Sequence, residues 1–276
     1  MRRLLAIVAI GMIIAGCWHG YFVFLEYQAG QELYEDIVDQ FTVCRNESVE
    51  TTDRNQDTDE QAERGPETSI AIANEESEQE LYPDDAPAQI EVDWKGLKEI
   101  NGDVVAWIQL PAIDISYPIV QGEDNNYYLH RSIEGKEIFS GCLFMDVYND
   151  PELQNFNTII YGHNMRDGSM FARLKEYDQS ETWKTCPYFW LYTEEGEYLY
   201  RIFSSHRTAV NGSTFTVRFA DKEYYIDWLQ KMKDRSNVKS DVELVYGDKV
   251  VTLSTCTSGS ETRQILQGVL VYQSFE

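Results

Sequence analysis

Eight short runs of β-branched and aromatic residues, separated by turn-forming residues, occur between Val104 and Tyr272 of this 276-residue chain. The runs are Val104–Leu110, Ile113–Val120, Cys142–Met145, Thr158–Tyr161, Tyr188–Tyr192, Tyr198–Ser204, Val250–Thr255 and Ile265–Tyr272. Such runs form strands, and a domain with many short strands closes into a barrel or stacks into a sandwich. The sequence therefore predicts a mainly β fold.

Two segments of this region predict helices instead. Trp94–Ile100 precedes the first strand, and Ala220–Asp234 lies among the later ones. The second segment has helical spacing of Phe219, Ile226, Leu229 and Met232, with Tyr225 and Trp228 nearby. This aromatic stripe indicates a helix that packs on the core rather than one that presents a ligand platform.

The N-terminal sequence predicts a segment that tethers the protein to a membrane. Arg2 and Arg3 precede Leu4–Leu25, an apolar run in which His19 is the one ionisable residue. Its 22 residues make about 33 Å of helix, enough to cross a bilayer core, and the basic residues favour a cytoplasmic N-terminus. The alternative is a cleaved signal peptide with a lipidated Cys17, but the apolar run continues well past that residue.

An acidic stretch separates this segment from the strands. Leu33, Ile37 and Phe41 predict a short amphipathic helix over residues 31–43. Residues 45–93 then contain 16 acidic and 3 basic side chains and few large apolar ones, which predicts an extended, self-repelling linker.

These patterns divide the chain into three predicted parts. Residues 1–28 are the predicted membrane anchor, residues 29–91 an acidic stalk with a short helix, and residues 92–276 the folded domain.

The formal charge of -24 argues against binding to nucleic acid, whose phosphates would repel such a surface. Five cysteines without a CxxC pair indicate neither a zinc ribbon nor a disulfide framework.

The most specific candidate site is at the end of the run Val250–Thr255. Cys256 follows this run, and Arg263 begins the next one after a short polar loop. If the two strands pair as a hairpin, Cys256 and Arg263 face each other, and the guanidinium favours a thiolate and can hold an oxyanion. The alternative is a buried structural cysteine beside a surface arginine.

A second candidate follows another strand. His163 comes after Thr158–Tyr161 and Gly162, where the glycine allows a tight backbone. Its imidazole titrates near neutral pH and can donate a proton to a leaving amine. No histidines or carboxylates have the spacing of metal ligands, so we predict no metal ion.

Several segments resemble those of the sortases, the cysteine transpeptidases of Gram-positive cell walls, in their class B form. The segments are Asn101–Ile108, Tyr117–Gln121, Asp124–Leu129, Tyr161–Met165, Asp167–Phe171 and Thr252–Cys256 with the following Arg263. The resemblance covers about residues 92–271, and the helix near Ala220–Asp234 matches a class B insertion. It implies a sortase-type β-barrel with an inserted helix and N-terminal helices.

The resemblance also implies a mechanism that needs no cofactor. Cys256 would attack the carbonyl of a Thr in the C-terminal sorting signal of a surface protein, with Arg263 stabilising the oxyanion and His163 protonating the departing amine. A peptidoglycan amine would then resolve the thioacyl enzyme. With the N-terminal anchor, this predicts a single-pass enzyme of the cell membrane, with a cytoplasmic N-terminus and an extracellular catalytic domain.

The same resemblance implies that Asn125 and Leu129 line the peptide groove and that Tyr161 and Ser254 lie close to the catalytic pair. Their alternative roles are those of turn, core and strand positions. The class B groove implies an Asn-Pro-x-Thr-like sorting signal.

Two other functions stay open at this stage. A cysteine peptidase would use the same nucleophile with water as acceptor, although in papain-like enzymes the cysteine precedes the histidine, whereas here His163 precedes Cys256. A non-catalytic, membrane-tethered wall-binding domain would show no thiol chemistry at Cys256.

Overall fold

The computed structural model describes residues 2–45, 83, 85–257 and 261–275, apart from the side chains of residues 2–10 and 256. Eight strands close into a barrel in the order β10-β8-β7-β3-β4-β5-β6-β9. They are β3 (Val104–Leu110), β4 (Ile115–Val120), β5 (Leu143–Met145), β6 (Asn157–Tyr161), β7 (Tyr188–Tyr192), β8 (Gly196–Ala209), β9 (Val250–Cys256) and β10 (Thr262–Phe275). The β4–β5 and β6–β9 pairs are parallel and the others antiparallel. The predicted mainly β barrel is confirmed.

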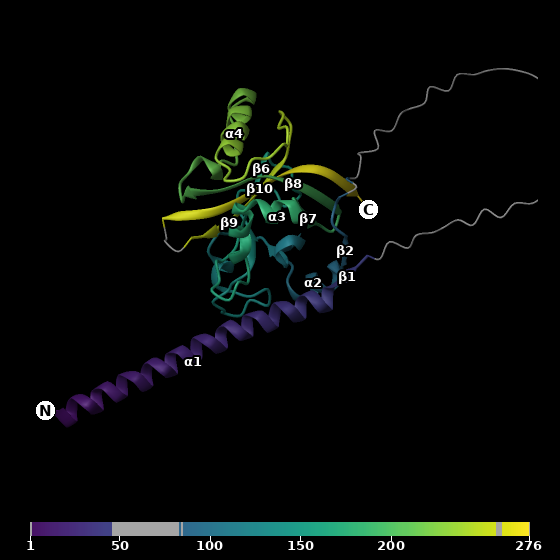
Figure 1. The fold of residues 1–276 in the computed structure, drawn as a ribbon. Helices are drawn as coiled ribbons and strands as arrows, with labels where there is room; N and C mark the ends of the chain where they lie inside the picture. The colour runs from purple at the N-terminus through teal and green to yellow at the C-terminus, as the bar shows by residue number, and fades with distance from the viewer. Residues whose placement is uncertain (1, 46–82, 84, 258–260, 276) are drawn as a thin grey trace, which may run out of the picture.

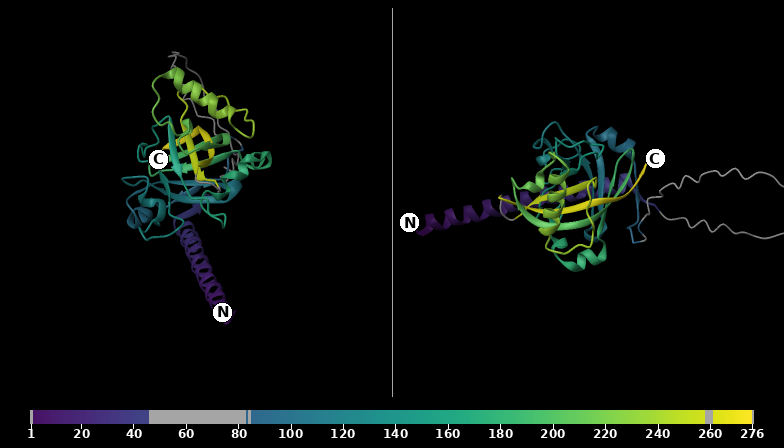
Figure 2. Two further views of the ribbon diagram at one scale, coloured as in Figure 1. Left: turned by 90° about the vertical axis from the view of Figure 1, so that its left-hand side faces the viewer. Right: turned by 90° about the horizontal axis from the view of Figure 1, so that it is seen from above.

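Helices and a small sheet surround the barrel. The α-helices are α1 (Arg2–Phe41), α2 (Trp94–Ile100), α3 (Ser180–Thr185) and α4 (Lys222–Asp234). Four 3₁₀ turns are η1 (Pro111–Ile113), η2 (Tyr127–His130), η3 (Ala172–Asp178) and η4 (Ser213–Phe215), and β1 (Thr42–Cys44) pairs with β2 (Ile90–Val92). α1 and α4 lie on opposite sides of the barrel (Figures 1 and 2).

Three strands differ in length from the predicted runs by more than one residue. The run predicted to begin at Ile113 begins at Ile115, because Pro111 starts a 3₁₀ turn that ends at the left-handed Asp114 (φ 48°). β8 and β10 are each 14 residues long, longer than their apolar runs. They pair with each other over nearly their whole length, so backbone hydrogen bonds extend them through polar ends that carry no apolar signal.

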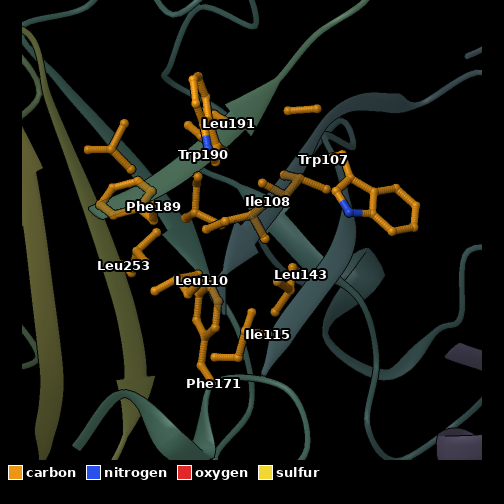
Figure 3. Close-up of a cluster of buried hydrophobic side chains, with 14 of the residues drawn as sticks. Trp107, Ile108, Leu110, Ile115, Leu143, Phe171, Phe189, Trp190, Leu191 and Leu253 are labelled. Carbon is orange, nitrogen blue, oxygen red and sulfur yellow. The ribbon is translucent and has the colours of Figure 1, made fainter. Parts of the chain in front are cut away.

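The core fills the barrel. Leu110, Phe189 and Leu253 come from three different strands and are completely buried (Figure 3). Gly268 of β10 lies directly against the Phe189 ring, where an added Cβ would overlap the ring. The alternating apolar positions of the strands thus meet in one interior.

The inserted helix α4 packs on the outside of the barrel. Tyr225, Trp228, Leu229 and Met232 are buried there with Phe203 of β8 and the strand residues Val250 and Val269. The expectation that Ile226 shares this face is wrong, since Ile226 is exposed. The buried positions repeat every three to four residues, and residue 226 lies about 100° around the helix from position 225.

The helix predicted over residues 31–43 ends at Phe41, where strand β1 follows, and is the last part of one 40-residue helix, α1 (Figure 1). Tyr34, Ile37 and Phe41 are buried in the same core cluster as the barrel residues. The Tyr34 hydroxyl donates a hydrogen bond to the Gly141 carbonyl at 2.6 Å. The end of α1 therefore docks on the barrel, which its apolar spacing alone did not indicate.

The pairing of β1 with β2 brings the two ends of the acidic stretch together, and the Asp93 amide donates to the Phe41 carbonyl at 2.9 Å. Most of the predicted extended linker falls on residues 46–82 and 84, which lie outside the described residues. Part of the predicted Leu4–Leu25 segment also lies outside them, because the side chains of residues 4–10 are not described. Over the described residues, we find no helix both long and apolar enough to span a membrane.

Candidate active site

Three strand ends meet at one rim of the barrel. β6 and β9 are parallel, with Tyr161 opposite Ser254, and the Gly162 amide donates to the Ser254 carbonyl at 3.1 Å. His163 and Cys256 each lie two residues beyond this paired position, where β6 has ended and β9 is still paired with β10. β9 and β10 are antiparallel, with Cys256 opposite Arg263, as the predicted hairpin requires.

Gly162 is required for this arrangement. A Cβ at this position would overlap the side chains of Leu143 and Phe171. The backbone that carries His163 out of β6 can pass between these two apolar side chains only because residue 162 has none.

A cavity of about 320 Å³ opens at the same rim. It is lined by the predicted site residues Asn125, Leu129, Tyr161, His163, Ser254 and Arg263, and further by Phe144, Gly162, Val210, Phe215 and Thr255. The side chain of Cys256 lies outside the described residues. All six predicted side chains that are described thus line one cavity.

The sequence did not indicate the apolar part of this lining. Phe144 belongs to the buried strand β5, where its pattern indicates only core packing. Val210 and Phe215 lie in the connection between β8 and α4, far along the chain from the other lining residues. No local pattern marks such positions, because only the closed barrel brings them to the cavity.

The His163 imidazole is held by a backbone hydrogen bond and by ring stacking. Its Nε2 lies 2.6 Å from the Leu129 carbonyl oxygen, which only accepts, so Nε2 carries the proton and Nδ1 is left to exchange one. The ring stacks on His130 and Phe139, with centroids 5.2 and 6.0 Å away, and Phe139 stacks in turn on Tyr27 of α1. Helix α1 therefore supports the imidazole through Phe139.

The same surroundings set the protonation of His163. Burial lowers the pKa of the imidazole, the hydrogen bond to Leu129 opposes this, and the nearby His130 lowers the pKa further. At neutral pH the ring is therefore neutral and can accept a proton at Nδ1.

A buried carboxylate, Asp146, orients two of the side chains that line the cavity, and the sequence did not indicate it. Its Oδ2 accepts hydrogen bonds from the Tyr161 hydroxyl at 2.9 Å and from Asn125 Nδ2 at 3.0 Å. Its Oδ1 accepts from the Tyr148 amide at 2.9 Å, and Asn125 Oδ1 accepts from the Val147 amide at 2.9 Å. Asn125 and Tyr161 are thus held in one orientation toward the cavity.

The Arg263 guanidinium brings a positive charge to the lining of the cavity. The half-buried Arg263 donates from Nη1 to the Thr262 carbonyl at 3.1 Å. Burial and the Asp146 carboxylate raise the pKa of Tyr161, and the Arg263 guanidinium opposes this rise. Tyr161 therefore remains a protonated phenol, and a positive charge is within electrostatic reach of the cavity.

Ser254 adds a buried hydroxyl to the lining of the cavity. Its side chain is completely buried, and its Oγ makes no hydrogen bond within the described part of the chain. An unpaired buried hydroxyl costs about 1–3 kcal/mol, so a polar group entering the cavity would gain from pairing with it.

The arrangement resembles known proteins over most of the chain. The family model described as "Sortase domain" matches residues 108–271. Sortase B of Listeria monocytogenes is 31% identical over 255 residues, which are 91% of this chain and 93% of that protein.

Solved structures give the same result. The structure of sortase B from B. anthracis in complex with AAEK1 has a TM-score of 0.67 and 28% identity, covering 90% of this chain and 98% of that one. The Staphylococcus aureus sortase B-substrate complex has a TM-score of 0.61 and 30% identity, covering 64% of this chain and 83% of that one.

Proposed function

This chain belongs to the class B sortases and is a cysteine transpeptidase, and from this premise we propose which residues carry the reaction and what it acts on. The observation that carries the proposal is the convergence of the ends of β6, β9 and β10 at one cavity. Cys256 is the nucleophile, His163 the acid and base, and Arg263 the oxyanion partner.

The first half of the reaction forms a thioester. The Cys256 thiol gives its proton to Nδ1 of His163, and the sulfur attacks the carbonyl carbon of a Thr in the substrate. The Arg263 guanidinium stabilises the negative oxygen of the tetrahedral intermediate. The C–N bond then breaks, and the departing amine takes the proton from His163.

The second half transfers the acyl group. An amine attacks the thioester carbonyl, the C–S bond breaks, and the amine's proton passes through His163 to the sulfur. The neutral imidazole favoured by burial suits both halves, because it must accept a proton at the start of each.

Asn125, Leu129, Tyr161 and Ser254 bind the substrate peptide. Support comes from their place in the wall of the 320 Å³ cavity and from the hydrogen bonds that hold Asn125 and Tyr161 to Asp146. A rigid amide and phenol can recognise a polar side chain at low entropic cost. The substrate we propose is an Asn-Pro-x-Thr-like C-terminal sorting signal of surface proteins, cleaved after Thr and joined to a peptidoglycan amine.

The location we propose is the outer face of the cell membrane. Residues 1–28 anchor the chain with a cytoplasmic N-terminus, residues 29–91 connect the anchor to the enzyme, and residues 92–276 form the catalytic domain. Arg2 and Arg3 ahead of the apolar run support the orientation. The docked residue Phe41 keeps the end of the anchor helix α1 against the barrel.

Mass spectrometry of the full-length chain in detergent tests the reaction. We expect that incubation with sorting peptides and an amine gives a thioester on Cys256 and then the peptide–amine product. Cys256→Ala abolishes both, whereas Cys44→Ala, at an exposed cysteine, changes neither.

The same experiment separates the rival functions. Hydrolysed peptide without any amine product, at every amine concentration, would identify a cysteine peptidase. Undiminished cleavage and transfer by Cys256→Ala would contradict the assignment of the nucleophile, and binding without thioester would identify a wall-binding domain.

A further inference from the structure

A second histidine lies against the proposed acid and base, and none of the roles proposed above uses it. The His130 ring stacks on the His163 ring, with the ring centroids 5.2 Å apart and 28° between the planes. Phe139 completes the stack, since its centroid lies 6.1 Å from that of His130 and 6.0 Å from that of His163. Each of the three rings therefore contacts the other two beside the cavity that His163 lines.

The segment that carries His130 holds His163 at two points. The Leu129 carbonyl accepts the hydrogen bond from Nε2, and the next side chain along the chain stacks on the ring. The hydrogen bond alone does not fix the imidazole plane, because rotation about the Cβ–Cγ bond has broad minima and swings Nδ1 with little movement of Nε2. The stacked rings oppose this rotation. Nδ1, the atom that exchanges the proton, thus depends on the stack for its direction.

The backbone around His130 is itself held in place. The His130 carbonyl accepts a hydrogen bond from the Ile138 amide at 3.1 Å. Two residues earlier, the Tyr128 carbonyl accepts from the Cys142 amide at 3.0 Å. The chain over residues 138–142 therefore returns along η2 and fixes the position from which the His130 ring projects.

The two imidazoles differ in exposure and have no carboxylate partner in the described part of the chain. His130 is exposed, whereas His163 is half-buried. Among the residues whose placement is described, no carboxylate pairs with either ring within 4.0 Å. A proton on one ring is therefore not neutralised by an ion pair there and acts on the other ring, 5.2 Å away.

The charged groups on the loop that follows His130 are paired with one another. Arg131 pairs with Glu137 at 3.7 Å, and Lys136 pairs with Glu134 at 2.7 Å. Each pair has no net charge, so the loop adds little to the field at the two imidazoles.

The other elements beside the stack contribute a cation and a phenol. Arg263 of β10 lines the same cavity as His163, and its positive charge also disfavours a protonated His163. Tyr27 of α1 stacks on Phe139 with the ring centroids 5.8 Å apart. Of the groups named here, the two imidazoles are the ones whose charge changes between pH 5 and pH 8.

We propose that His130 is a positioning residue for His163, which fixes the plane of its imidazole and takes up the first proton of the pair in mild acid. The inference rests on the proposed transfer function and adds a residue that acts through His163 without touching the substrate. The first proton goes to His130 because the exposed ring keeps more of its hydration when it is charged. Its charge then opposes a second proton on His163, so Nδ1 stays free to accept the proton of the Cys256 thiol. The same charge makes the imidazolium that forms in the reaction a stronger acid toward the departing amine.

An NMR titration of the full-length chain in detergent, with isotope-labelled histidine, tests the protonation. The chain has four histidines, and His163→Gln identifies the signal of His163. His130→Phe keeps a ring in the stack but cannot be protonated. In this variant we expect the midpoint of the His163 titration to rise by about 0.5 pH unit or more. His19→Phe, the same substitution at another exposed histidine, is the matched control and should not move the midpoint.

The rate of thioester formation at pH 8, where both rings are neutral, tests the positioning. His130→Ala removes the ring, and we expect kcat to fall about tenfold with little change in KM for the sorting peptide, because Nδ1 is no longer held toward the sulfur. His130→Phe restores most of the rate, since the stack needs a ring and not a charge at this pH.

The two measurements can each overturn the inference. An unchanged His163 midpoint in His130→Phe would contradict the protonation role. A rate in His130→Ala equal to that of the unmodified chain, or a loss that His130→Phe does not restore, would contradict the positioning role. All of these results leave the proposed transfer intact, whereas no thioester on the unmodified chain would refute the proposed function itself.

Discussion

Replacing Asp146 with Asn tests whether a buried carboxylate holds the substrate wall. Asp146 is 6% exposed and accepts hydrogen bonds from three donors: Tyr161, Asn125 and the Tyr148 amide. An asparagine has the same shape but only one acceptor oxygen. If that oxygen faces Tyr148, the new NH₂ meets the NH₂ of Asn125.

The neighbours cannot all adapt to this change. The Tyr161 hydroxyl can rotate to accept, but a flip of the Asn125 amide would turn its NH₂ toward the Val147 amide, which it now accepts from. At least one buried donor is left unpaired, and a hydrogen bond to a charged acceptor is lost. Each effect costs about 1–3 kcal/mol, so Asp146→Asn is expected to lower the free energy of unfolding by about 2–4 kcal/mol.

Urea unfolding and peptide kinetics measure the two consequences. We expect the loss of stability together with a higher KM for the sorting peptide, because Asn125 and Tyr161 are no longer oriented. Asp241→Asn is the control: this exposed carboxylate pairs with Arg201 at 3.0 Å, and its removal should cost about 0–1 kcal/mol. Unfolding free energy and KM both unchanged in Asp146→Asn would refute the reasoning.

Three further predictions concern the fold. Burial lowers the pKa of His206 to about 4, so below about pH 6.5 the unfolded chain binds a proton that the folded chain does not. The free energy of unfolding should therefore fall by about 3 kcal/mol between pH 7 and pH 4. Urea unfolding at both pH values would show this fall, and a smaller fall in His206→Gln. Gly162→Ala should cost about 1–3 kcal/mol in thermal unfolding, whereas Gly102→Ala, with open space around it, should cost little. A chain beginning at Val92 lacks the buried Phe41 and its neighbours on α1, and its free energy of unfolding should fall by several kcal/mol, about 1.5–3 kcal/mol for each large apolar side chain. A truncated chain as stable as the full chain in urea would contradict the docking of α1.

The strands of the barrel could be predicted because each is encoded locally. Their β-branched and aromatic runs and the turn residues between them are readable in a window of a few residues. The extra length of β8 and β10 was not predictable in this way, because their ends are polar and are strands only where a neighbouring strand pairs with them. The same holds for Ile226, whose exposure depends on where α4 meets the barrel.

Part of the candidate site could also be predicted from the local sequence, and part could not. Cys256 and Arg263 belong to one hairpin, whose register follows from a short loop, and His163 stands at a recognisable strand end. Asp146, Phe144 and Phe215 had no signal, since a buried acid or aromatic residue in a strand or loop looks the same in sequence whether it faces a cavity or the core.

By itself, the sequence determined the class of fold, the strand ends that carry sulfur, imidazole and guanidinium, and the family to which they belong. Only the tertiary structure decided that β6 runs parallel to β9 and that Tyr27 of α1 supports His163 through Phe139. The physical reason is distance along the chain. Local patterns are set by neighbouring residues, whereas these contacts join segments that meet only when the barrel closes.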